Sequence, residues 1–274
     1  YAEMVESCDA LLIGAGAGMG TDSGLPDFRG KEGFWRAYPP LAKLGIRFEE
    51  MANPSWFKKD PKLAWGFYGH RYNLYQETKP HQGYFIIRKW VNHFRIPSFV
   101  FTSNVDGQFQ KAGFSEDHII EIHGSIHHLQ HFSSVNGVWS ADELEVTIDD
   151  NLHFVGEIPN DEGRLLRPNI LMFADYEWAS SRTDEQYSRV NKYVEKYFTD
   201  DASKTVIIEM GAGTGIPSIR NFGARRQRNG EVLIRINPRE SQGPRGTISI
   251  PMGAKAALEG IDQIIMEKQQ KLQV

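Results

Sequence analysis

Four short apolar segments, each followed closely by glycine, asparagine or proline, constrain the fold of this chain most. They lie at residues 8–13, 98–102, 205–209 and 232–236. Runs of this length behind turn-forming residues are typical of strands buried on both faces of a parallel sheet. We therefore predict an α/β fold, a Rossmann-like doubly wound parallel sheet with a smaller inserted helical and β module, and a ligand at the carboxyl ends of the strands.

The two stretches expected to form the inserted module differ in composition. Residues 33–90 are rich in aromatic and helix-forming residues, which predicts helices whose aromatic side chains mostly fill the interior, with direct ligand contact as the alternative. Residues 133–166 are polar and acidic, with turn signals and alternating apolar residues that predict a small β excursion. From Ala254 onward the pattern indicates a closing helix. The aromatic residues in question are Trp56, Phe57, Trp65, Phe67, Tyr68, Tyr72 and Tyr75.

Composition and charge exclude several function classes. The chain has 274 residues, of which 40% are hydrophobic and 24% charged, as in ordinary globular proteins. Its net charge of −4 argues against a general nucleic-acid binder, and no apolar run approaches the roughly 20 residues that cross a bilayer. A signal peptide is not expected, and the single cysteine, Cys8, excludes an intrachain disulfide and suits a reducing cytoplasm.

A glycine-rich turn, residues 14–20, follows the first apolar segment. Closely spaced glycines at the end of a strand allow backbone N–H groups to approach a pyrophosphate. The strict dinucleotide fingerprint fails, because its third glycine falls on Met19. On this segment alone, a strand-to-helix turn without a ligand remains an alternative.

Three longer motifs sharpen this hypothesis. Residues 16–29 read GAGMGTDSGLPDFR, residues 102–107 read TSNVDG, and residues 121–125 read EIHGS. Together, in this order and approximate spacing, they resemble the signatures of the sirtuin family. Weaker similarities at 79–81, 211–214 and 236–237 extend the resemblance over nearly the whole chain, apart from residues 133–166. Taken singly, Asp106-Gly107 and His123-Gly124 are equally ordinary turns.

The resemblance implies a site that binds NAD and breaks the bond between nicotinamide and ribose. His123 would be the general base, Asn104 would position the ribose hydroxyls or a water, and Asp106 would hold the nicotinamide carboxamide. These three are the predicted catalytic residues. The wider cofactor site would comprise Gly16, Ala17, Gly18 and Gly20 at the phosphates, Ser103 beside Asn104, the closing loop Asp27, Phe28 and Arg29, and Gly211, Ala212, Gly213, Thr214 and Asn237 at the adenosine half.

The resemblance also implies the division of the chain and its activity. Residues 1–32, 80–132 and 167–274 would form the NAD-binding domain, and residues 33–79 and 133–166 the small module. The expected activity is a deacylase that transfers the acyl group of a protein lysine to ADP-ribose. Two alternatives stay open: ADP-ribosyl transfer to a protein or NAD hydrolysis at the same site, and an NAD or ADP-ribose sensor without turnover. The partner would be an acylated or ADP-ribosylated protein, with no nucleic acid and no membrane.

The chain departs from the family in three places. Most sirtuins carry four zinc-binding cysteines after the histidine motif, and here only histidines lie nearby, so we expect no metal and apolar packing in its place. Ser103 stands where glutamine is usual, and Ala174-Asp175 where Gly-Glu is expected, which weakens the prediction of peptide binding more than that of NAD binding. Features near residues 208–217 also resemble macrodomain-linked sirtuins that transfer ADP-ribose. The histidines concerned are His127, His128, His131 and His153.

Overall fold

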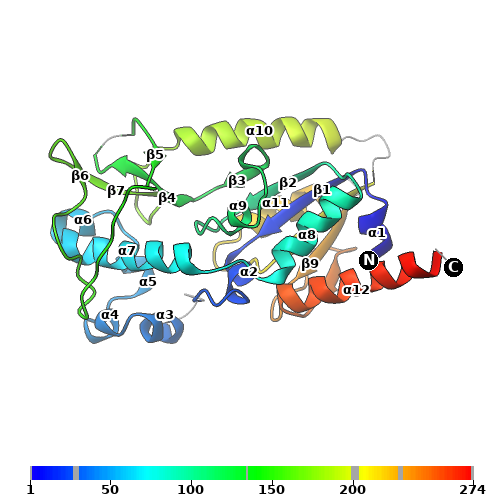
Figure 1. Cartoon of the computed structure of the whole chain (residues 1–274), viewed down its shortest axis with the longest axis horizontal. Coiled ribbons are helices and arrows are strands. Elements are labelled where there is room, and N and C mark those ends of the chain that lie inside the picture. The colour runs from blue at the N-terminus through cyan, green and yellow to red at the C-terminus, as the bar shows by residue number, and fades with distance from the viewer. Residues whose placement is uncertain (1, 27–30, 134, 199–203, 228–230, 273–274) are drawn as a thin grey trace.

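The computed structural model describes residues 2–26, 31–133, 135–198, 204–227 and 231–272. Its main element is a six-stranded parallel sheet with the order β10-β9-β8-β1-β2-β3, which confirms the predicted fold (Figure 1). The strands are β1 (Ala10–Ala15), β2 (Ser98–Thr102), β3 (Ile119–Glu121), β8 (Thr205–Met210), β9 (Val232–Ile236) and β10 (Ile248–Ile250). From β1 the chain adds β2 and β3 on one side, and it later adds β8, β9 and β10 on the other side. The strand order therefore reverses between β1 and β8. In a doubly wound sheet this switch point is where ligands bind.

Both faces of this sheet are covered, as the apolar runs predict. In β1, Leu11 and Ile13 pack with α8 (Gln82–His93), α12 (Ala254–Leu272) and the short α1 (Ala2–Glu6). The alternate residue Leu12 packs on the other face with α10 (Ser181–Tyr197), and α11 (Ser218–Gln227) covers the same face. Because successive side chains of a strand point to opposite faces, a strand that is apolar throughout requires this double cover.

The helical part of the second module consists of α3 (Lys31–Ala37), α4 (Pro39–Lys43), α5 (Phe48–Met51), α6 (Trp56–Lys59) and α7 (Pro61–Glu77). Proline at the first position of α7 and the Asp60 side chain, which accepts from the Leu63 amide, fix where that helix begins. Trp65 and Phe67 are fully buried and Tyr72 nearly so. The aromatic stretch is therefore largely interior packing, as predicted.

A four-stranded antiparallel sheet completes this module. Its order is β5-β4-β7-β6, and the strands are β4 (Gly124–His131), β5 (Trp139–Ser140), β6 (Asn160–Asp161) and β7 (Arg164–Ile170). Its apolar side chains share one core with the helices α3 to α7. In the region after the histidine motif, where the sequence predicts apolar packing in place of zinc, five apolar side chains are buried in this core: Leu129, Phe132, Leu152, Phe154 and Leu166.

Three short elements lie near the junction of the two sheets: α2 (Ala17–Thr21), α9 (Gln108–Lys111) and the 3-10 helix Glu116–His118. Only Ile122 and His123 separate the end of β3 from the start of β4. The predicted base therefore lies on the direct link between the parallel sheet and the antiparallel sheet. No helix in the described part of the chain is long and apolar enough to cross a membrane.

Candidate functional site

The glycine-rich turn after β1 packs directly against the turn after β8. The amide of Gly16 donates to the Met210 carbonyl at 2.9 Å, and the amide of Gly18 donates to the Gly211 carbonyl at 3.0 Å. A Cβ added to Gly16 would lie 2.7 Å from the Ala212 Cα, and one added to Gly18 would lie 2.7 Å from the Gly211 Cα. The glycines thus let two backbones meet at the switch point, a role in addition to the predicted approach of a phosphate.

Gly211 is the most constrained residue of this contact. Its φ is +60°, in the left-handed region, and an added Cβ would lie 2.2 Å from the backbone nitrogen of Met19. Both the backbone conformation and the space therefore require glycine. Ala17, the first residue of α2, follows Gly16 and starts the helix at the edge of this contact.

The end of β2 adds the second predicted motif to the same edge. The Thr102 hydroxyl donates to the Ala15 carbonyl at 2.9 Å, and the Ser103 amide donates to the same carbonyl at 3.1 Å. The side-chain amide of Asn104 donates to the Gly16 carbonyl at 3.0 Å. These bonds attach Ser103 and Asn104 to the glycine-rich turn.

Asp106 is a buried carboxylate, 7% exposed, close to Gly20. A Cβ added to Gly20 would lie 3.5 Å from the Asp106 Oδ2, and the Gln108 amide donates to Oδ1 at 3.0 Å. Burial raises the pKa of Asp106 to about 6, against the lowering effect of the Gln108 amide and the Arg71 guanidinium. The group is thus mostly an ionised acceptor at neutral pH, held beside the glycine-rich turn.

His123 lies against the same segment. Its imidazole lies against the Ser103 backbone, and burial lowers its pKa below the ordinary value, against the raising effect of that backbone group. A neutral imidazole has one unprotonated ring nitrogen. The structure therefore brings an imidazole able to accept a proton next to the residue that precedes Asn104.

The predicted adenosine end is built around the carbonyl of Ala212. The Asn237 side chain donates to this carbonyl at 3.0 Å. The Thr214 hydroxyl donates to Glu240 Oε1 at 2.6 Å, and Arg220 Nη1 donates to the Glu240 carbonyl at 2.7 Å. Gly213 lies between these attachment points, half-buried.

Glu240 and Arg220 were not predicted from the sequence. Neither belongs to a recognisable motif, and their partners lie 26 and 20 residues away along the chain. Their contribution becomes visible only once β8 and β9 are adjacent. Among the predicted residues, Asp27, Phe28 and Arg29 lie outside the described part of the chain.

The segment after β7 accommodates the departure at Ala174-Asp175. Ala174 has φ +52°, the left-handed conformation that favours glycine. The Asp175 carboxylate pairs with Arg167 at 2.7 and 2.8 Å, and both side chains are fully buried. The Leu171 amide donates to the His123 carbonyl at 2.9 Å, so this segment is tied directly to the predicted base.

The histidines of the small module have other partners. His131 Nε2 lies 2.7 Å from the Asp161 carboxylate, and His153 lies 3.9 Å from both Asp60 and Asp149. Within the described ranges, no group of three or more His, Cys, Asp or Glu residues is placed to hold a metal ion.

The fold, and the residues gathered at the carboxyl ends of β1, β2 and β8, define a class of protein. It is the class of Rossmann-like proteins with a small helical and β module beside the switch point of the sheet. A profile described as the Sir2 family matches residues 16–194. An NAD-dependent protein deacylase of Aquifex aeolicus is 31% identical over 231 residues, which cover 82% of each chain. One from Pyrococcus abyssi is 29% identical over 259 residues, 86% of this chain and 94% of the relative. The chain belongs to the Sir2 family.

Other similarities are more limited. An NAD-dependent protein deacetylase of Saccharolobus solfataricus is 32% identical over 176 residues, and the match spans 64% of its length. A solved Sir2 homologue mutant in complex with ADP-ribose superposes with a TM-score of 0.70 at 21% identity, covering 98% of this chain and 96% of that one. A Sir2 homologue in complex with NAD gives 0.68 at 21% identity, over 97% and 93%. These two structures show the shared fold.

Proposed function

We propose that this protein is an NAD-dependent protein-lysine deacylase that cleaves the nicotinamide–ribose bond and transfers the acyl group to ADP-ribose. The observation that carries the proposal is the junction at residue 123. There, the His123 imidazole lies against the backbone of Ser103, and the next residue, Asn104, is attached to the glycine-rich turn through the Gly16 carbonyl. The deacylase relatives and the solved complexes with ADP-ribose and NAD support the proposal.

The donor and acceptor groups of the site fit NAD. The Asp106 carboxylate accepts one hydrogen bond from Gln108, which leaves acceptor capacity for the N–H groups of a carboxamide. Gly20 lies directly beside it, and a Cβ there would come 3.0 Å from the Leu25 side chain and 3.5 Å from the Asp106 Oδ2. We assign the nicotinamide end to Asp106, the phosphates to residues 16–20, and the adenosine half to residues 211–214 with Asn237. The loop at Asp27, Phe28 and Arg29 remains part of this proposal.

Each catalytic residue then has a separate task. Bound NAD supplies a ribose carbon whose bond to cationic nicotinamide breaks as the acyl oxygen of the lysine substrate attacks it. His123 is neutral at physiological pH and accepts a proton from a ribose hydroxyl. Asn104 orients the ribose through an amide already fixed on the Gly16 carbonyl. Overall, NAD, acyl-lysine and water give nicotinamide, lysine and O-acyl-ADP-ribose.

The same site could serve ADP-ribosyl transfer to a protein or NAD hydrolysis. Ser103, which replaces the usual glutamine beside Asn104, favours this second candidate. An NAD sensor without turnover is the third. We also keep as proposals that the protein acts in the cytoplasm on a protein substrate, and that neither nucleic acid nor membrane is a partner.

Mass spectrometry of all products formed from NAD and acylated peptides tests the proposal. We expect nicotinamide and O-acyl-ADP-ribose in step with deacylated lysine, and His123→Ala should bind NAD normally while turnover falls by roughly 10² or more. His153→Ala, at a half-exposed histidine of the small module, is the matched control and should keep full turnover. ADP-ribose attached to protein, or free ADP-ribose formed from NAD alone, would contradict the deacylase proposal and support the second candidate function. NAD binding without any product would indicate the sensor.

A further inference from the structure

Glu121 belongs to the motif EIHGS, but the proposed mechanism gives it no task. It is the last residue of β3, and it is 1% exposed. Only Ile122 separates it from His123. Burying a carboxyl group costs free energy unless the group is paired and hydrogen-bonded, so the partners of Glu121 show what this part of the chain is attached to.

The backbone of Glu121 is bound by α10 at the edge of the main sheet. Among the strands that the structure describes, β3 is at the end of the sheet and pairs with β2. The Glu121 amide donates to Gln186 Oε1 at 3.0 Å, and the Thr183 hydroxyl donates to the Glu121 carbonyl at 3.3 Å. On the side of β2, the Ile122 amide donates to the Thr102 carbonyl at 2.9 Å. The backbone that leads into the predicted base is therefore fixed from both sides.

The carboxylate of Glu121 is bound by the same helix. Arg182 Nη2 donates to Glu121 Oε2 at 2.6 Å and to Glu116 Oε2 at 3.3 Å. The two carboxylates differ in environment, because the side chain of Glu116 is 56% exposed and that of Glu121 only 1%. Solvent screens the pair with Glu116, whereas the pair with Glu121 keeps most of its electrostatic strength.

A second element, α9, contacts the same carboxylate. The Gln110 side chain lies against Glu121 and favours its ionised form. At the start of α9, the Gln108 amide donates to the Asp106 carboxylate at 3.0 Å. The strand that leads to His123 and the turn that carries Asp106 are thus both connected to this one buried carboxylate.

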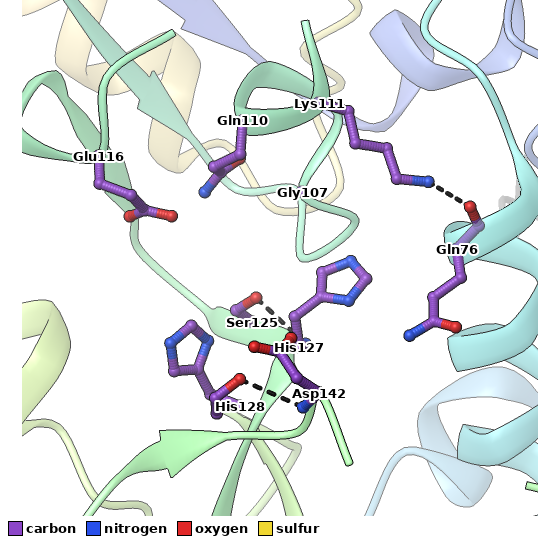
Figure 2. A pocket seen from close by; sticks show the side chains of 10 residues that line it. Gln76, Gly107, Gln110, Lys111, Glu116, Ser125, His127, His128 and Asp142 are labelled. Atoms are coloured by element: carbon purple, nitrogen blue, oxygen red, sulfur yellow. Dashed lines mark hydrogen bonds between the residues drawn. The ribbon is translucent and has the colours of Figure 1, made fainter. Parts of the chain in front are cut away.

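Figure 2 shows the hollow next to this pair. Glu116 and Gln110 extend toward the same open space, whereas Lys111 extends away from them toward Gln76. The Lys111 ammonium donates to the Gln76 carbonyl at 2.5 Å. On β4, burial lowers the pKa of His128 to about 4, so this imidazole is uncharged at neutral pH. The guanidinium on α10 is therefore the cation that compensates the buried carboxylate.

Glu121 titrates near neutral pH. Burial raises its pKa to about 7, against the lowering effect of Arg182; Glu116 adds to the increase, and Gln110 opposes it. Above this pH the carboxylate is ionised and paired with the guanidinium. Below it the group is protonated, and the ion pair is lost.

We propose that Glu121 is a positioning residue, whose carboxylate, bound to Arg182, fixes the imidazole of His123 relative to Asp106. This inference rests on the proposed role of His123 as the general base. Because Glu121 acts through the backbone that carries the base, its loss should affect the chemical step more than the binding of NAD.

Glu121→Gln keeps the shape of the side chain and removes its charge. At pH 8 we expect its kcat for deacylation to be at least about fivefold below that of the wild type, with NAD dissociation constants within about twofold. At pH 5.5 the wild-type carboxyl group is itself mostly protonated, so the two proteins should differ by less than about twofold. A role in packing alone would give the same ratio at both pH values. The titrations of His123 and Asp106 occur in both proteins and cancel in this ratio.

Glu116→Gln is the matched control, because it removes the exposed partner of the same guanidinium. Its kcat should stay within about twofold of the wild type at both pH values. Arg182→Met should lower kcat as Glu121→Gln does, and the double variant should be no worse than either single variant, since each removes the same ion pair. Thermal melts establish which variants are folded. The double variant leaves neither charge of the pair buried alone, and it serves if Arg182→Met does not fold.

Three kinetic results would overturn the proposal: a kcat of Glu121→Gln within twofold of the wild type at pH 8, the same ratio at both pH values, or an equal loss in Glu116→Gln. NMR signals of the His123 ring, assigned with His123→Ala, give a readout that needs no turnover. They should be displaced in Glu121→Gln at pH 8 and not in Glu116→Gln, and unchanged signals in both variants would also overturn the proposal. A wild type that forms no deacylated lysine would contradict the proposed function, and the NMR comparison would still decide the role of Glu121.

Discussion

Replacing Asp106 by asparagine is expected to stabilise the folded protein and to lower its activity. The carboxyl group is buried, and its pKa rises from 3.8 to about 6 on folding. At roughly 1.4 kcal/mol per pKa unit, ionising it in the folded state costs up to about 3 kcal/mol more than in the unfolded chain. Asparagine has nearly the same shape and keeps an oxygen for the Gln108 amide, but it buries no charge.

The size of this effect depends on pH. Because the folded-state pKa of Asp106 lies above the unfolded-state value, the folded protein binds more protons between about pH 4 and pH 6. The contribution of this group to wild-type stability therefore decreases as pH rises through that window. The advantage of Asp106→Asn should be about 1.5 kcal/mol at pH 5 and about 3 kcal/mol at pH 8.

Denaturant titrations of both proteins at the two pH values measure this difference. Asp150→Asn, at an exposed position, is the control and should change the free energy of unfolding by less than about 0.5 kcal/mol. The activity of Asp106→Asn should fall about 10- to 10²-fold, since a neutral amide replaces a charged hydrogen-bond acceptor. A variant less stable than wild type at pH 8, or equally stabilised at both pH values, would refute the reasoning.

Three further substitutions test the backbone and the buried pair by denaturant titration. Ala174→Gly should stabilise the protein by about 0.5–1 kcal/mol, because relief of the left-handed strain at φ +52° exceeds the entropic cost of glycine; a loss of stability would contradict this. Arg167→Met should cost about 3–5 kcal/mol by leaving Asp175 buried without its partner, and adding Asp175→Leu should recover part of the loss. Gly211→Ala should lower the free energy of unfolding by more than about 2 kcal/mol, because the added Cβ clashes with the backbone. Gly24→Ala is the control: Gly24 has φ +87° but open space around it, so the loss should be only about 1 kcal/mol. Equal losses for the two variants would argue against the clash.

The main sheet could be predicted from the sequence because its strands are buried on both faces. Segments such as Ala10–Ala15 and Thr205–Met210 are buried at every residue and mostly apolar, with a turn directly behind them. The antiparallel sheet gave a weaker signal. β4 carries three histidines and a glutamine, and its partner β7 begins 33 residues after β4 ends, so local pattern could not establish that pairing.

The site was predictable to the extent that it consists of contiguous motifs. Asn104 and His123 follow strands of one sheet, and their proximity follows from the parallel arrangement. The contact of Gly18 with Gly211 depends on β1 and β8 being neighbours, which no short motif encodes. The left-handed backbone at Ala174 could not be predicted from the sequence either, because an alanine does not indicate a positive φ.

The predicted domain boundaries at residues 32–33, 79–80, 132–133 and 166–167 remain a proposal. Two of them fall inside elements of the structure, 32–33 in α3 and 166–167 in β7. Limited proteolysis, followed by identification of the fragments, would show which of these boundaries are cleaved first.

A crystal structure of the protein with bound ADP-ribose tests the central claim most directly. We expect the pyrophosphate against the backbone of residues 17–20, the adenosine beside Asn237, and the ribose that carried nicotinamide within hydrogen-bonding reach of Asn104 and His123. ADP-ribose bound elsewhere, or with this ribose turned away from the imidazole, would contradict the account.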